Sequence, residues 1–368
     1  MKSSLQRRFL GNKLILPLVL LIALLSSVSA IHAASSGVVP RGSITVMTRN
    51  LYVGAAFDPL LNAPTPDDIP GLVAQVYSTI LSSRFPCRAE AIADEIVQSQ
   101  PDLVGLQEAA LLRVQSPCGT SLQNPPQPIS IAIDYLQILL DALERRGAHY
   151  AVATSVTNTD ITVTSVTGDT IRLTDRDAIL VRTDLSTNDL RVSKAQAKNF
   201  DIRFTVQVGG QGGPSVTVIR GWCSVDVRVR GRSVRVVNTH LEESNLFIQI
   251  AQANELLAGP LRTILPVISL GDFNASVGST TYGNFLTAGF HDAWPLAHPG
   301  DPGFSCCQAE DLLNPTSQLN TRIDLVLFHS GRIGVDDIHL LGADPTDRLP
   351  SGQWPSDHAG AVGTLSIK

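Results

Sequence analysis

The chain has 368 residues, of which 43% are hydrophobic and 17% are charged, and its formal net charge is −5. This length and composition allow a full hydrophobic core and exclude a disordered tail or a minimal scaffold. The acidic balance argues against a protein that holds nucleic acid by broad neutralisation of phosphates, although a local basic groove can coexist with a negative total.

The N-terminus has the pattern of an export signal. Lys2, Arg7 and Arg8 precede an apolar run over residues 14–25, and small residues follow that run. An apolar run of this length is shorter than the about 20 residues that a membrane span needs, although an uncleaved anchor remains an alternative. The pattern predicts a secreted or extracytoplasmic protein. It divides the chain into three expected parts: a signal peptide over 1–33, a linker over 34–42 and a folded domain over 43–368.

The five cysteines fit an oxidising compartment only loosely, because an odd number leaves at least one unpaired. We expect Cys87 to pair with Cys118, since both flank loop-like sequence that contains proline. Cys223 lies in a strand-like run and is expected to be a small buried residue. No spacing among the cysteines, which include Cys306 and Cys307, is typical of a zinc site.

The first half of the chain alternates strand-like and helical segments. Residues 43–52 and 102–108 are apolar runs of strand length, and residues 88–100 between them carry apolar side chains at helical spacing. A proline-rich connection over 116–128 leads to a second helical segment at 133–147.

The second half is richer in strands. Residues 214–229 and 233–241 predict a hairpin whose turn is Arg230-Gly231-Arg232, and the glycine-rich stretch at 209–214 is expected to be another hairpin loop. A third, weaker helical segment covers 246–257. The remaining predicted strands are 177–182, 265–274, 322–329 and 360–367. Strands and helices intermixed with hairpins predict an α/β sandwich that contains mixed sheets.

Several predicted strands end in polar residues that are suited to chemistry. Taken singly, Asn50 could form a turn, Glu108 could cap a helix, Asp272 could form an Asx turn, and His240 could be a satisfied core histidine. Asp324 is different, because a carboxylate inside an apolar strand must be paired or hydrogen-bonded. The complete set also includes Asn274, Asp357 and His358.

As a set, these residues point to phosphate-ester hydrolysis. Strand ends in α/β sheets converge on one crevice, where a site usually lies. Glu108, Asn50, Asp272 and Asp357 could supply the oxygen ligands that a hard cation such as Mg²⁺ requires. His358 with Asp324 behind it would form an oriented, charge-stabilised imidazole. Hydrolysis needs such a cation, a group that directs water, and help for the leaving oxygen.

The motif order TRNLY, LVGLQEA, VVNTHLE, SLGDFNA, RIDLVLF and PSDHAG resembles the endonuclease/exonuclease/phosphatase superfamily. This superfamily includes pancreatic-type deoxyribonucleases, abasic-site endonucleases, secreted sphingomyelinases and inositol-polyphosphate phosphatases. The resemblance covers about residues 43–368 and implies a catalytic domain there. It also implies a four-layer α-β-β-α sandwich, in which two mixed sheets pack face to face and helices flank them.

The resemblance also implies the metal side of the site. Glu108 would be the principal metal ligand, Asn50 would support it, and Asp357 would complete the acidic cluster. The expected cofactor is Mg²⁺, with Mn²⁺ or Ca²⁺ as alternatives.

The resemblance assigns the remaining residues to the phosphate and the water. Asp272 would position or activate the attacking water, and Asn274 would hydrogen-bond the phosphate. His240 would contact the phosphate or help to protonate the leaving group. His358 would pair with Asp324, and either Asp272 or His358 could be the general base. Some members orient the histidine that corresponds to His240 with an acid, for which Asp175 and Asp177 are both candidates.

These expectations lead to a secreted, divalent-metal-dependent phosphodiesterase that hydrolyses phosphate esters by in-line attack of water. A nuclease or general phosphodiesterase ranks first, a sphingomyelinase-like phospholipase C second and an inositol-phosphate phosphatase third. With 5% aromatic residues, the sequence shows no obvious apolar hairpin for membranes. A non-catalytic binding protein on the same fold is the competing class.

The expected partner is a phosphate-ester substrate, from nucleic acid, a phospholipid head group or a small phosphodiester. No stable protein partner is implied, and a monomer is expected.

Overall fold

The computed structural model describes residues 42–116 and 130–368. The expected signal peptide, the linker up to residue 41, and Cys118 lie outside these segments, so the expected Cys87–Cys118 bridge stays a prediction. Cys223 is buried, as predicted. In the described segments, no helix has the length and apolar character that crossing a membrane requires.

The larger sheet has eight strands in the order β15-β16-β1-β2-β6-β3-β4, and β5 also pairs with β6. Strand β1 runs parallel to β2 and antiparallel to β16, so the sheet is mixed. Its strands are β1 (Ser43–Asn50), β2 (Leu103–Gln107), β3 (Leu111–Gln115), β4 (Ser130–Asp134), β5 (Tyr150–Thr164), β6 (Thr170–Arg182), β15 (Ile333–Leu341) and β16 (Gly360–Ile367).

The second sheet has six strands in the order β13-β14-β12-β11-β10-β7. Only β11 and β12 are parallel neighbours, and the other pairs are antiparallel. Its strands are β7 (Leu190–Asn199), β10 (Gly221–Val229), β11 (Arg232–His240), β12 (Val267–Asp272), β13 (His291–Asp292) and β14 (Asp324–His329). A separate hairpin consists of β8 (Phe204–Gln207) and β9 (Ser215–Val218).

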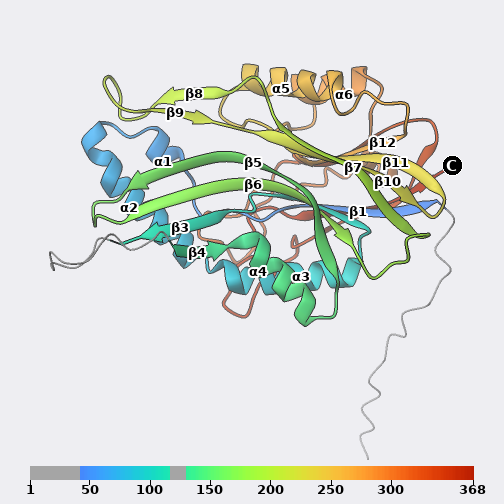
Figure 1. Cartoon of the computed structure of the whole chain (residues 1–368), viewed down its shortest axis with the longest axis horizontal. Coiled ribbons are helices and arrows are strands. Elements are labelled where there is room, and N and C mark those ends of the chain that lie inside the picture. Colours follow the sequence, from blue (N-terminus) through green and yellow to red (C-terminus); the bar gives the residue numbers. More distant parts are fainter. Residues whose placement is uncertain (1–41, 117–129) are drawn as a thin grey trace, which may run out of the picture. The chain divides into compact units, whose positions relative to one another are not determined.

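Helices cover the outer face of each sheet, as Figure 1 shows. One core lies between the larger sheet and the helices α2, α3 and α4, and another lies between the second sheet and the helices α5 and α6. The helices are α1 (Asp58–Leu61), α2 (Ile69–Ser82), α3 (Phe85–Ser99), α4 (Tyr135–Arg145), α5 (Leu246–Ala258), α6 (Thr280–Thr287) and α7 (Ala293–Ala297), with short 3₁₀ turns at Pro66–Asp68 and Pro345–Asp347.

A third core joins the inner faces of the two sheets. Ile44, Leu103 and Ile179 of the larger sheet pack in one cluster with Val225, Val236 and Ile268 of the second. Their alternation with outward-facing residues is what period-2 side-chain geometry requires of a strand with two different faces. The predicted four-layer α-β-β-α sandwich is therefore confirmed.

The sequence prediction differs from the structure in several elements. The predicted strand over 214–229 is two strands, β9 and β10, which belong to different sheets. Helix α2 and strands β5, β7 and β15 were not predicted. Strands β5 and β7 are rich in Thr, Ser, Asn and Lys and are largely exposed, so they lack the apolar alternation on which the prediction depended.

Candidate active site

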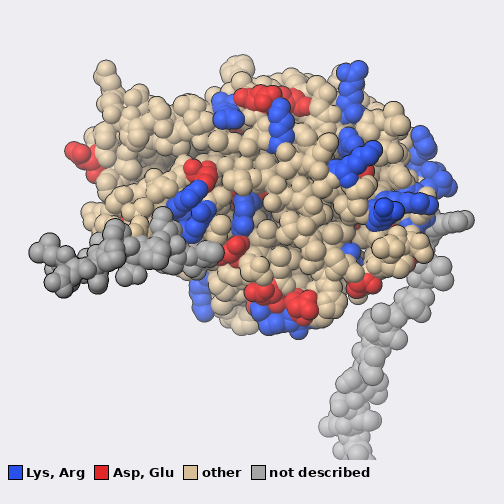
Figure 2. Space-filling model, in the orientation of Figure 1, with Lys and Arg blue, Asp and Glu red and all other residues tan. Residues whose placement is uncertain are grey.

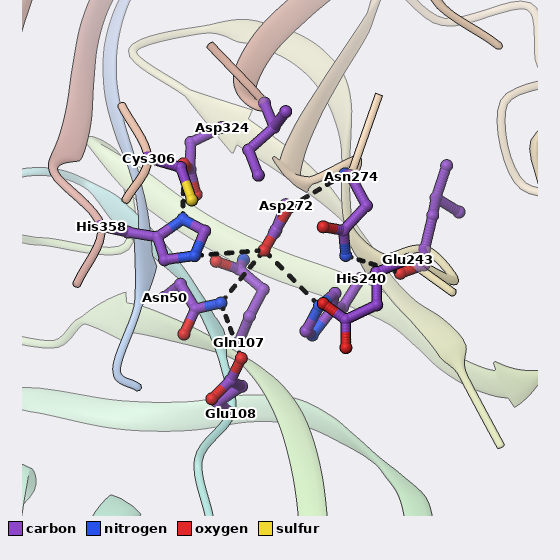
Figure 3. Close-up of polar contacts among 12 residues, drawn as sticks. Asn50, Gln107, Glu108, His240, Glu243, Asp272, Asn274, Cys306, Asp324 and His358 are labelled. Carbon is purple, nitrogen blue, oxygen red and sulfur yellow. Dashed lines mark hydrogen bonds and ion pairs between the residues drawn. The ribbon is translucent and has the colours of Figure 1, made fainter. Parts of the chain in front are cut away.

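Strand register brings the polar strand ends together. Asp272 lies opposite Asp324 of the antiparallel neighbour β14 and opposite His240 of the parallel neighbour β11. In the other sheet, β1 ends at Asn50, which is paired with Gln107, and Glu108 follows directly. Figure 3 shows these side chains and His358 pointing toward one another from the two sheets.

The Asp272 carboxylate is the centre of the cluster. Its Oδ2 accepts a hydrogen bond from Asn50 Nδ2 at 3.1 Å, and it lies 3.5 Å from His240 Nε2 and 3.8 Å from His358 Nε2. Burial raises the pKa of Asp272 to about 7 in the metal-free chain; His358 opposes this rise and Asp324 adds to it. Asp272 can therefore exchange a proton near neutral pH.

The backbone before Asp272 accepts only glycine. Gly271 has φ +146°, and a Cβ atom there would lie 2.0 Å from the Thr239 carbonyl oxygen. The glycine of the SLGDFNA motif thus allows the two parallel strands to approach at the point where His240 and Asp272 leave them.

His358 is held by a buried carboxylate. Its Nδ1 lies 2.8 Å from Asp324 Oδ2, and its backbone oxygen accepts a hydrogen bond from Arg49 Nη1. The Ser305 hydroxyl accepts the backbone N–H of Asp324 and so fixes that strand end. Burial alone would lower the pKa of His358, but Asp324, Asp357 and Asp272 together hold it well above its usual value. The imidazolium form is therefore favoured.

His240 has a different partner from the one the resemblance implied. Its Nδ1 lies 3.0 Å from Arg220 Nη1, whereas Asp177 and Asp175 accept hydrogen bonds from Asn158 Nδ2 at 2.8 and 3.3 Å. Both aspartates lie within 4.8 Å of His240, measured between potential ligand atoms. Burial, Arg220 and His358 hold the pKa of His240 well below its usual value.

Glu108 joins the site through Asn50, which also donates to Asp272. Its two carboxylate oxygens accept hydrogen bonds from Asn50 Nδ2 at 3.0 Å and from the Val53 backbone N–H at 2.7 Å. It adopts φ 55°, a left-handed conformation that non-glycine residues rarely take and that clusters at functional sites. Burial, then Asp357 and then Asp175 raise its pKa to about 7.

This donor set fits a divalent cation. Glu108 and Asp357 repel each other at a partly buried position, so a bound cation would relieve the cost of their negative charges. The available atoms are carboxylate and amide oxygens, which are the ligands that hard cations prefer. Glu108 and Asp357 would hold the ion, and Asn50 orients Glu108.

Asn274 lies just beyond the end of β12. The predicted strand over 265–274 stops at Asp272, and Asn274 takes φ 48°, so Asn274 is not part of the strand. The backbone N–H of Asn274 donates to Asp272 Oδ1 at 2.9 Å, an Asx turn, and its Nδ2 donates to the Leu241 carbonyl at 3.0 Å.

Two buried arginines that the sequence prediction did not include support the site. Arg88 donates to the carbonyl oxygens of Leu51, Tyr52 and Pro355 at 2.7 to 3.0 Å, so it joins the loops after Asn50 and before Asp357. Arg49, paired with Glu95 at 2.9 Å, contacts the His358 backbone. In the sequence, the only indication that Arg49 lies at the site is that it directly precedes Asn50.

Comparison with known proteins agrees with this geometry. Residues 80–358 match the family model described as the Endonuclease/Exonuclease/phosphatase family. No curated protein matches the chain by sequence search.

Several solved structures resemble the fold. A family protein from Bacteroides thetaiotaomicron is 18% identical with a TM-score of 0.53, over 89% of this chain and 95% of that one. A mannosyl-6-phosphatase from Bacteroides thetaiotaomicron VPI-5482 is 19% identical with a TM-score of 0.52, over 88% and 100%. A family protein from Leptotrichia buccalis C-1013-b is 14% identical with a TM-score of 0.52, also over 88% and 100%. The chain therefore belongs to the endonuclease/exonuclease/phosphatase family of phosphoric ester hydrolases, which generally depend on divalent metals.

Proposed function

We propose that the protein is a secreted, Mg²⁺-dependent phosphodiesterase in which water attacks phosphorus in line with the leaving oxygen. The observation that carries this proposal is the position of Asp272 among Asn50, His240 and His358, with Glu108 on the far side of Asn50. Secretion rests on the sequence pattern of the first 33 residues alone.

We assign the base to Asp272. His358 is held as an imidazolium by Asp324, so at neutral pH it has no free lone pair with which to accept a proton from water. Asp272, with a pKa near 7, is partly ionised at that pH and can accept the proton. His358 then stabilises the negative charge that develops on the phosphoryl oxygens.

When bound at Glu108 and Asp357, Mg²⁺ would supply Lewis-acid polarisation of the phosphate. The protein's own contribution on that side is to hold the two carboxylates in place. Val53 and Asn50 fix Glu108, and the Ser356 hydroxyl donates to the Asn50 carbonyl at 2.8 Å and lies 3.3 Å from Asp357 Oδ1.

The charge distribution favours a small phosphodiester over a long nucleic acid. On the face in Figure 2, Lys and Arg gather toward the right-hand end, and over the rest of the face they are separated by uncharged and acidic residues. Exposed Arg191, Arg228 and Arg232 gather at the hairpin end of β10 and β11. His240 is at the other end of β11, roughly 25 Å away for a strand of this length. Those arginines therefore do not form a phosphate track at the site.

A phospholipid head-group ester is a second candidate, because apolar side chains are exposed beside the site. Phe247 is 83% exposed and Leu246 is 52% exposed at the start of α5. The Gln249 side chain ties this turn to the site, since its Nε2 donates to the carbonyl oxygens of Glu242 and Asn274, both at 2.8 Å. Exposed Phe and Leu on a helix end could enter a lipid surface.

The test compares substrates on one preparation of the mature chain. Bis-(p-nitrophenyl) phosphate, supercoiled plasmid, sphingomyelin vesicles and mannose 6-phosphate are offered with Mg²⁺, Mn²⁺ or Ca²⁺, and with EDTA. We expect metal-dependent turnover of the small diester, and loss of about 10²-fold or more in Asp272→Asn.

Each outcome discriminates between the candidates. Preference for sphingomyelin, reduced in Phe247→Ser but with the small diester unaffected, would favour the lipid esterase. Preference for mannose 6-phosphate would indicate a monoesterase. No turnover of any ester under any metal condition would overturn the proposal, and so would turnover that survives both EDTA and Asp272→Asn.

A further inference from the structure

The hydrogen-bond partner of His240 Nδ1 is a cation. Arg220 Nη1 lies 3.0 Å from this nitrogen. A guanidinium has donors only and remains protonated throughout the pH range in which proteins are folded. The Nδ1 atom must therefore act as the acceptor. Neutral imidazole has one proton, so that proton is on Nε2, which faces Asp272 Oδ2 at 3.5 Å.

We infer that Arg220 is a positioning residue that locks His240 in its neutral Nε2–H tautomer, so that His240 offers the bound phosphate a hydrogen-bond donor and not an acidic proton. The tautomer follows from the contact alone. Its meaning for the phosphate rests on the proposed function.

Arg220 is built into the fold at this position. Gly221 lies opposite His240 in the antiparallel β10–β11 pair, so the residue before it reaches the end of the histidine strand. The Arg220 side chain is 11% exposed, and its carbonyl accepts the Phe200 N–H at 3.0 Å. Its contacts with Asp175 and Glu243 are long, at 3.9 and 3.8 Å, so His240 is its short hydrogen-bond partner among the described residues.

Because charged groups surround His240, its tautomer determines whether Nε2 offers them a proton or a lone pair. Asp175 and Asp177 of β6 lie within 4.8 Å of a ring nitrogen of His240, and Asp272 of β12 lies 3.5 Å from Nε2 and 3.8 Å from His358 Nε2. If Nδ1–H donated to a β6 carboxylate, Nε2 would present a lone pair to the Asp272 carboxylate and to any phosphate oxygen. Arg220 opposes this arrangement. Asn158 engages the Oδ2 atoms of both β6 carboxylates, whereas the buried Asp177 Oδ1 has no hydrogen-bond partner among the described residues.

The first test is nitrogen NMR of the metal-free mature chain labelled with ¹⁵N-histidine, in which His240→Gln assigns the signals. We expect His240 to show a protonated Nε2 and an unprotonated Nδ1, without titration between about pH 5.5 and 8.5. An Nδ1–H tautomer, or an imidazolium near neutral pH, would overturn the inference. This measurement requires no variant of Arg220 and no knowledge of the substrate.

The second test changes the partner. Arg220→Met removes the donor and the charge, so His240 should titrate within this range and populate both tautomers, and kcat should fall about 10- to 100-fold with a new dependence on pH. Arg220→Lys retains a cationic donor and should restore most of both properties. If Arg220→Met leaves the His240 signals and the pH profile unchanged, Arg220 is only structural. If Arg220→Met fails to fold, the wild-type and Arg220→Lys spectra still show which tautomer His240 adopts.

Arg235→Met is the matched control. Arg235 lies on the same strand as His240, is 15% exposed, and is paired with Asp226 at 2.7 Å near the far end of the strand. The control should leave the His240 spectrum and the rate unchanged. If the wild-type protein hydrolyses no phosphate ester, the proposed function fails, while the spectra still test the tautomer separately.

Discussion

The two histidines that face Asp272 have hydrogen-bond partners of opposite charge. His358 has a carboxylate behind Nδ1, at 2.8 Å in Asp324, whereas His240 has a guanidinium there, at 3.0 Å in Arg220. Both rings are nearly completely buried, yet the pKa of one is raised well above the usual value and that of the other is lowered well below it. The group behind the ring thus decides whether Nε2 presents a cationic or a neutral donor.

This difference predicts unequal roles for two side chains at similar distances from one carboxylate oxygen. A residue that works through its positive charge cannot be replaced by a neutral amide, whereas a residue that works as a neutral donor can be replaced in part. Substitutions of the two histidines and of the acids near them test that contrast.

The largest effect is expected at His358. Both His358→Ala and His358→Gln should lower kcat about 10³- to 10⁴-fold, because neither variant provides a cation at Asp272. Steady-state kinetics on the small diester measure this. The control is His339→Gln, since His339 also pairs with an aspartate, Asp337 at 2.8 Å, but on the exposed surface. If His358→Gln retained most of the activity, the charge assigned to His358 would be wrong.

Asp324→Asn should have the next largest effect, about 10²-fold on kcat at neutral pH. Asp324 raises the pKa of His358, so its neutralisation lowers that pKa, and the imidazolium is lost at a lower pH. The basic limb of the pH–rate profile should therefore move toward lower pH. A variant with reduced kcat but an unshifted basic limb would show that Asp324 matters for packing alone.

His240 should tolerate an amide. We expect His240→Ala to lose about 10- to 100-fold in kcat and His240→Gln to recover several-fold of this loss, because the glutamine amide supplies a neutral donor. The comparison is made at saturating substrate and metal. Equal losses in the two variants would contradict the neutral-donor role.

The smallest effect concerns stability. The pKa of Glu108 is about 7 in the folded metal-free chain, above its ordinary value of 4.5, because of burial, Asp357 and Asp175. A raised folded-state pKa contributes stability that is complete below about pH 4.5 and is lost as pH rises through 7. In EDTA, the wild-type Tm should therefore fall by several degrees more than that of Glu108→Gln between about pH 5 and 8.

Metal should reverse this loss in the wild type. Mg²⁺ in excess at about pH 8 should raise the wild-type Tm, because an ion that binds only the folded state stabilises it, and should raise that of Glu108→Gln less. Asp272 titrates in the same range in both proteins, so the difference between them isolates Glu108. If Tm changes with pH in parallel in the two proteins, Glu108 is not part of the metal site.

The order of the motifs was enough to predict the fold and the strand ends that carry the site. The partner of His240 was not predicted, although the predicted hairpin turn determines which residue lies opposite His240. Pairing Val229 with Arg232 and counting back places Gly221 opposite His240, and so places Arg220 at the end of the pair. What the sequence could not reveal is that Asn158, 17 and 19 residues before the two β6 aspartates, would engage both of them.

Asn274 shows the limit of periodicity. The sequence predicted a strand that continues to Asn274, but the Asp272 carboxylate accepts a hydrogen bond from the backbone N–H of Asn274, and the chain turns there. A short carboxylate side chain competes for backbone donors, and a pattern of apolar residues does not report that competition. Asp272 therefore both forms an Asx turn and lies at the centre of the site.

The register of the second sheet has a consequence for how the protein acquires activity. His240, Asp272 and Asp324 are neighbours only because three strands distant in sequence pair in one register, and a slip by one residue would turn each side chain to the opposite face. Non-local pairings of this kind form slowly. Regain of hydrolysis during refolding should therefore follow completion of the β11-β12-β14 pairing, and partly folded chains should be inactive even where their helices have formed.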